Sequence, residues 1–289
     1  MKRFWLILCA ALLAACATGT VPAPGGDSQA ASRNNRIADQ GAANATNSQP
    51  GADAATAPSA SSEQQTAARR AVGEDERQGL DKALLKAAEA GETAKVSALV
   101  GRGADANAVN SIRVPGSPLT ALMLAVVHGH VETARALLDK GANVNATADF
   151  PSGGPTAPQK GVTALMQAAA SGDLPMVKLL VERKADVNAR DGEGATALSG
   201  TTDGKVIVYL LEHKADPNVR DSAGNTALIN LAKHSRFGDA SSVAAAEAML
   251  AKGADVNAAN RDGETPLGVA EQTGKDELVA LFRKAGAKR

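Results

Sequence analysis

Histidines, cysteines and a periodic row of Asp and Asn residues are the side chains of this 289-residue chain that could bind a metal ion or drive acid–base chemistry. His128 and His130 have the spacing of a metal-binding pair, but only two other histidines and no suitable cysteine could complete the coordination shell. No Ser/His/Asp or Cys/His arrangement suits nucleophilic catalysis. We therefore predict no metal site, no cofactor and no catalytic residue, and hence no enzyme.

A glycine-rich stretch at residues 192–197 fits the G-x-G-x-x-A form of a dinucleotide-binding loop. That motif requires a buried strand in front of it within a βαβ unit, and this stretch does not follow one. We interpret the glycines as hairpin turn residues, with Asp191 and Asp221 supplying side-chain turn bonds.

One sequence unit returns along most of the chain and must position these side chains. Residues 163–191 read TALMQAAASGDLPMVKLLVERKADVNARD, and the opening Thr-Ala/Pro-Leu recurs at five positions, Thr120, Thr163, Thr196, Thr226 and Thr265. Closing segments of the form Gly/Lys-Ala-Asp/Asn-x-Asn lie at residues 141–145, 184–188, 214–218 and 253–257. An earlier closing at 103–107 has a degraded opening at 82–84. A fixed period in the low thirties predicts a solenoid.

Each unit has the pattern of two short helices. Thr163 can cap the first helix, whose small apolar stripe includes Leu165 and Ala168. The stripe from Met176 to Val181 suits a second, antiparallel helix. Such a pair cannot bury both faces alone, so the units must stack on one another. The low aromatic content, 2%, agrees with stacked short helices.

These units resemble ankyrin repeats, about six of them, from about residue 79 to the C-terminus. The resemblance implies an all-α solenoid of helix-turn-helix repeats with hairpin loops. It also implies that His128 serves a turn, and that the Asp/Asn row, including Asp105 and Asn107, satisfies loop backbone rather than binding calcium. In ankyrin-like proteins the partner commonly binds the face formed by hairpin tips and first helices.

The first residues have the pattern of a bacterial lipoprotein signal. Lys2 and Arg3 precede an apolar run, and Leu13-Ala14-Ala15-Cys16 resembles the lipobox, which implies cleavage before Cys16 and lipidation of its thiol. An ordinary secretory signal remains the alternative. Cys9 would leave with the signal, so no disulfide can form in the mature chain. We expect a lipid-anchored protein facing the periplasm, with Ala17 favouring the outer membrane.

The predicted organisation is a signal peptide at 1–15, the lipidated cysteine and a disordered linker at 16–75, and the repeat domain at 76–289. The linker is built of Ala, Ser, Asn, Pro and similar residues and cannot bury enough apolar surface to fold. The chain has 31 basic and 31 acidic residues and no basic stripe, so we predict no nucleic-acid partner.

Four departures from the repeat pattern are candidate functional features. Inserts at 108–119 and 146–160 lengthen two neighbouring hairpins into fingers, which could bind a partner or fold back on their own repeats. The fourth unit is three residues short, so its first helix around 198–202 is expected to be clipped. The fifth unit is six residues longer than the repeat pattern, and residues 233–242 are expected to loop out.

From these positions we predict a surface that binds an unidentified protein of the bacterial envelope, as a scaffold or adaptor. An inhibitor or immunity protein that blocks an envelope-acting enzyme or toxin remains open, as does a small-ligand carrier or enzyme using a groove near the fourth repeat. The candidate contact residues are Glu89, Ile112, Val127, His128, Phe150, Ser171, Arg190, Glu193, Arg220, Asn225, Lys233, His234, Phe237, Arg261, Glu264 and Gln272.

Overall fold

The computed structural model of the protein describes residues 73–110, 118–150, 159–235 and 240–288. The chain divides into two units, Met1–Ala57 and Pro58–Arg289, and all described residues lie in the second. The predicted signal, Cys16 and most of the predicted linker lie outside the described residues, as do Ile112 and Phe237. No helix in the described ranges is long and apolar enough to cross a membrane.

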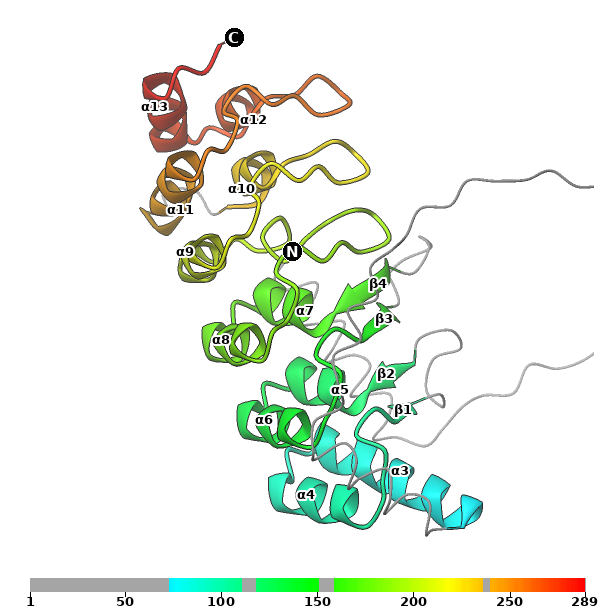
Figure 1. Ribbon diagram of the computed structural model, residues 1–289. Coiled ribbons are helices and arrows are strands. Elements are labelled where there is room, and N and C mark those ends of the chain that lie inside the picture. The colour runs from blue at the N-terminus through cyan, green and yellow to red at the C-terminus, as the bar shows by residue number, and fades with distance from the viewer. Residues whose placement is uncertain (1–72, 111–117, 151–158, 236–239, 289) are drawn as a thin grey trace, which may run out of the picture. The chain divides into compact units, whose positions relative to one another are not determined.

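The described part of the chain contains eleven helices, which stack in two rows (Figure 1). The first-helix row holds α3 (Glu74–Glu89), α5 (Ala121–Val127), α7 (Ala164–Ser171), α10 (Ala227–His234) and α12 (Pro266–Gln272). The second-helix row holds α4 (Thr93–Gly101), α6 (Val131–Asp139), α8 (Leu174–Glu182), α9 (Gly204–Glu212), α11 (Ala240–Ala251) and α13 (Asp276–Lys284). The predicted solenoid of about six repeats is confirmed.

Threonine hydroxyls begin the first helices, as the sequence predicts. The Oγ1 atoms of Thr120, Thr163, Thr226 and Thr265 accept backbone N–H bonds of 3.2, 3.3, 3.5 and 3.1 Å from the third residue onwards. Gly172 ends α7 in the left-handed conformation, with φ of 71°. α3 lacks a threonine cap and instead carries three acidic residues in its first turn, where they favour the helix dipole.

The fourth repeat has no first helix, which confirms the predicted clipping. Residues 197–200 form a turn there, although Leu198 is still buried and Thr196 still accepts a bond from the Ser199 backbone N–H at 3.3 Å. The predicted loop at 233–242 is partly wrong, because Lys233 and His234 belong to the last turn of α10 and residues 240–242 belong to α11. The alanine-rich start of α11 gives no apolar stripe from which to locate it.

The two long hairpins contain short antiparallel strands beside the helices. β1 (Val109–Asn110) pairs with β2 (Leu119–Thr120), and β3 (Thr147–Phe150) pairs with β4 (Gln159–Thr163) with an irregular register. β2 and β3 contact each other, so the predicted fingers start side by side. Phe150 pairs in register with Gln159.

An asparagine ladder ties the hairpin bases of successive repeats together. Asn188 Oδ1 accepts a bond from Asp216 N at 2.9 Å, and its Nδ2 donates to Lys214 O at 3.0 Å in the next repeat. The same pair of bonds is made by the corresponding asparagines, Asn107, Asn145, Asn218 and Asn257. The predicted role of this row in satisfying loop backbone is confirmed.

The core consists of Leu, Val, Ala and Met between the rows, with Phe282 as a fully buried aromatic residue. Alanines at 0 to 1% exposure, including Ala125, Ala168 and Ala169, let the rows approach closely. Stability therefore comes from many small contacts between neighbouring repeats.

Candidate partner-binding surface

The hairpins lie on the side of the first-helix row that faces away from the second helices (Figure 1). Three of the predicted contact residues, Glu89, Val127 and Ser171, lie at the C-terminal ends of α3, α5 and α7. Arg190, Glu193, Arg220 and Arg261 lie in the hairpins and are exposed. The sequence therefore places these residues on one side of the repeat stack.

Backbone bonds join the hairpins of the third to sixth repeats into a continuous row. Gly192 N donates to Lys160 O at 2.7 Å, Ser222 N to Glu193 O at 2.6 Å, and Arg261 N to Ala223 O at 2.9 Å. Asp191 Oδ1 accepts the backbone N–H groups of Glu193 and Ala195 at 2.9 and 2.8 Å, which confirms that the glycine-rich stretch is a turn.

Two predicted contact residues also hold this row together. Arg190 Nη2 donates to Arg220 O at 2.6 Å, and Arg220 Nη1 donates to Ala259 O at 2.5 Å in the next hairpin. Both side chains remain exposed while making these bonds. The two arginines thus present fixed positive groups on the hairpin surface, because their guanidinium planes are held by backbone carbonyls.

Three further predicted residues meet in one polar cluster at the base of the last two hairpins. Lys233 Nζ lies 2.7 Å from Glu264 Oε2 and 3.3 Å from Asn225 Oδ1. Asn260 Nδ2 donates to Glu264 Oε2 at 2.7 Å and to Asn225 Oδ1 at 2.9 Å. Asn225 is buried, so its amide supports the hairpins from inside and we leave it out of the surface proposed below.

Hydrogen bonds from Lys233 and Asn260 hold the pKa of the Glu264 carboxyl below its ordinary value. A lowered folded-state pKa contributes stability that is present above the ordinary carboxyl pKa and is lost as the pH falls through the lowered one. Asn260 was not predicted from the sequence, although it stands where the two preceding hairpins have Asp191 and Asp221.

His128 and His130 form a stacked pair beside α3. Their ring centroids are 5.9 Å apart, and His130 Nε2 lies 3.0 Å from the Glu89 carbonyl oxygen. Burial lowers the pKa of His128, Glu89 opposes this, and His130 adds to the lowering. Within the described ranges, no group of three or more His, Cys, Asp or Glu side chains could hold a metal ion.

A buried lysine lies at the end of α10, beside the predicted contact residue His234. Lys275 is 5% exposed, and its Nζ donates to the Ala232 carbonyl oxygen. Burial lowers the pKa of Lys275. The pKa of His234 is also lowered, first by partial burial of its imidazole and then by the positive charges of Lys233 and Lys275. Gln272 is exposed at the end of α12. Lys275, which joins two repeats across 43 residues, was not predicted from the sequence.

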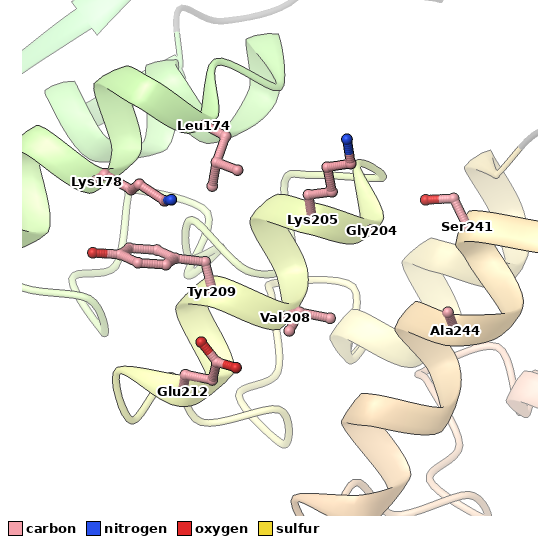
Figure 2. Close-up of a pocket in the computed structure, with 9 residues that line it drawn as sticks. All are labelled: Leu174, Lys178, Gly204, Lys205, Val208, Tyr209, Glu212, Ser241 and Ala244. Atoms are coloured by element: carbon pink, nitrogen blue, oxygen red, sulfur yellow. The ribbon is translucent and has the colours of Figure 1, made fainter.

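The opposite side of the stack carries a shallow groove near the fourth repeat. Its volume is about 370 Å³, and Figure 2 shows its lining residues, Leu174, Lys178, Gly204, Lys205, Val208, Tyr209, Glu212, Ser241 and Ala244. Burial, Glu182 and Glu212 raise the pKa of Tyr209. The charged lining residues are exposed. This lining therefore has no buried charged cluster of the kind that a catalytic pocket would need.

The architecture defines a class of helical-repeat proteins, and comparison with known proteins gives the family. A family model described as ankyrin repeats (3 copies) matches residues 60–148, 84–191, 150–221 and 195–288. The chain belongs to the ankyrin-repeat family. It is similar in structure to an ankyrin repeat domain from Acinetobacter baumannii AYE, at 25% identity, with a TM-score of 0.61 over 71% of this chain and 98% of that one. No curated protein matches.

Proposed function

We propose that the chain is a lipid-anchored, periplasm-facing ankyrin module that binds another protein of the bacterial envelope as a scaffold or adaptor. The observation that carries the proposal is the bonded row of hairpins with exposed Arg190, Glu193, Arg220 and Arg261. The guanidinium groups of Arg190 and Arg220 are held by backbone carbonyls and so lose little ordering entropy on binding, while exposed Glu193 adds the opposite charge. Ankyrin repeats are in general protein-interaction modules.

The binding proposal can be tested by crosslinking in intact cells with charge-reversed variants. Glu193→Arg combined with Arg261→Glu changes two exposed hairpin residues and leaves the net charge unaltered. Glu277→Arg combined with Lys284→Glu makes the same change on α13, in the second-helix row. We expect the hairpin variant to lose its crosslinked proteins and the α13 variant to keep them. Equal crosslinking by both variants would argue against the hairpin surface.

The anchor proposal rests on the sequence Leu13-Ala14-Ala15-Cys16, with Ala17 supporting the outer membrane. In this proposal acyl chains on Cys16 hold the protein at the membrane. We expect Cys16→Ser to move the protein from the membrane fraction to the soluble periplasmic fraction. Cys9→Ser is the matched control, since this residue leaves with the signal. Membrane retention of a Cys16→Ser protein whose signal has been removed would exclude lipidation as the anchor.

A second candidate function, an inhibitor that blocks an enzyme or toxin, is favoured by the β3–β4 finger, which extends the second hairpin. Deleting 149–159 leaves Ala148 and Val162 in register, joined by Lys160 and Gly161, whose φ is already +69°. If the finger enters an active site, the shortened protein should lose inhibition of the crosslinked enzyme. Unchanged binding after the deletion would favour the scaffold.

A further inference from the structure

The outward face of α9 carries a short stripe in which two apolar side chains lie between a lysine and a glutamate. Lys205, Val208, Tyr209 and Glu212 lie at spacings of three, four and seven residues, so they share one side of the helix and line the groove of Figure 2. Tyr209 is the chain's only tyrosine, and unlike the fully buried Phe282 it reaches the surface. We call these four residues the α9 stripe.

The groove exists because of how α9 sits between its neighbours. At Gly204 a Cβ atom would lie 2.3 Å from Ser241 Oγ and 2.7 Å from Ser241 O, so the start of α9 is packed tightly against α11. The wall formed by α11 is low, because Ser241 and Ala244 are small, and Leu174 and Lys178 of α8 form the other wall. The floor of the groove is therefore formed by α9 between α8 and α11.

The order of charged and apolar residues in the α9 stripe lets two antiparallel copies of the stripe pair opposite charges. Lys205 and Glu212 are equally far from the point between Val208 and Tyr209, and about 10 Å of helix rise separates them. A second α9 lying antiparallel across the first places its Glu212 beside Lys205 and its Lys205 beside Glu212. The two Val208–Tyr209 pairs then meet at the centre, where each contact occurs twice by two-fold symmetry.

We propose that the groove is a homodimer contact in which the α9 stripe of a second copy packs antiparallel on the α9 stripe of the first. The apolar pair supplies the buried centre and the two Lys205–Glu212 pairs fix the direction. A volume of about 370 Å³ has room for large side chains from a second helix. Lys178 Nζ lies 5.7 Å from the Tyr209 ring centroid, within the range of a cation–π contact.

The dimer goes beyond the function proposed above, because it uses the opposite side of the stack from the hairpins (Figure 1). Both hairpin rows stay free, so a dimer would offer two partner-binding surfaces and bind a clustered partner with higher avidity. One helix and its flanks bury less than the about 1,200–2,000 Å² of a standard stable interface, so the dimer should be weak, in the micromolar range or above.

A charge-swap series on the full chain tests the contact by sedimentation velocity, with Cys16→Ser in every sample to remove any lipid-driven association. Lys205→Glu places like charges at both ends of the contact and should weaken dimerisation about tenfold or more, as should Glu212→Lys. The double variant Lys205→Glu/Glu212→Lys should dimerise again, and an equal mixture of the two single variants should form a heterodimer. Lys284→Glu on α13 should leave dimerisation unchanged.

Two outcomes would overturn the proposal. One is a chain that stays monomeric at about 0.5 mM, where a micromolar dimer would be well populated. The other is a dimer in which the single variants dimerise as well as the starting protein, or in which the double variant does not recover the affinity lost in the single variants. Far-ultraviolet circular dichroism on each variant checks that the exposed substitutions leave the helices folded.

Discussion

Gly91 shows how one residue at a repeat junction depends on a side chain from the next repeat. Its φ is +74°, and a Cβ atom there would lie 2.7 Å from His130 Nδ1. We expect Gly91→Ala to destabilise the domain by about 1–2 kcal/mol from the left-handed backbone alone. A further loss follows, because the His130 ring must move away from the Glu89 carbonyl oxygen that it contacts at 3.0 Å. Urea unfolding measures the sum.

Gly253→Ala separates these two effects. Gly253 has a φ of +85° and no atom within 4 Å of the Cβ position, so its substitution carries the backbone cost without the clash. Gly91→Ala should therefore cost more than Gly253→Ala, and the excess should shrink when His130→Ala is added to both. Equal costs for the two glycines would show that the His130 ring gives way freely.

The asparagine ladder acts between structural elements. In each Asp/Asn pair the second residue bonds the next repeat, and the first residue makes a bond within its own turn. Asn218 Nδ2 donates to Gly253 O at 2.8 Å in the next repeat, whereas Asn143 Oδ1 accepts only the local bond from Asn145 N, at 3.0 Å. Asn218→Asp removes the donor and sets a carboxylate against a carbonyl, so we expect a loss of about 0.5–1.5 kcal/mol for this exposed bond. Thermal and urea unfolding measure it.

Asn143→Asp is the matched control, because Asp186, Asp216 and Asp255 stand at the equivalent position of other repeats and accept the same local bond. We expect this change to be nearly neutral. If both substitutions cost the same, the carboxylate charge rather than the inter-repeat bond would be the cause.

The helices were predictable because their determinants are local, and the ladder was predictable because its Asp and Asn residues recur at the same position of successive repeats. The threonine hydroxyl that caps a helix accepts a bond from the backbone N–H only three residues later, so the helix start is marked in the sequence. The clipped fourth repeat was predicted because its unit is three residues shorter than the others. Lys275 was missed because no repeated pattern marks it and its partner Ala232 lies 43 residues away. Asn260 occupies the turn position of Asp191 and Asp221, but its bond to Asn225 across 35 residues is visible only in the structure. The α9 stripe was visible as residues, but only the packing of Gly204 on Ser241 turns it into the floor of a groove.

At the scale of the whole repeat domain, the fourth repeat is the place where the stack is held by the fewest elements. α7 contacts α5 and α8, and α10 contacts α11 and α12, while the residues between them form a turn instead of a helix. Coupling between the first three repeats and the last two therefore passes through α9, which contacts both α8 and α11, through the asparagine ladder and through the hairpin row. In a repeat protein, such an interface term decides whether the two sides unfold together.

Leu210→Ala should make the first three repeats and the last two repeats unfold independently. Leu210 of α9 and Leu137 of α6 are both 0% exposed and each lies four residues before the residue that turns out of its helix, Lys214 or Gly141. Each truncation should cost about 2–5 kcal/mol. After Leu210→Ala we expect α8 and α11 to lose hydrogen-exchange protection at different urea concentrations, because the helix that couples them is weakened. After Leu137→Ala they should still lose it together, since α9 is intact. Coincident loss in both variants would mean that the asparagine ladder and the hairpin row together are enough to couple the two sides.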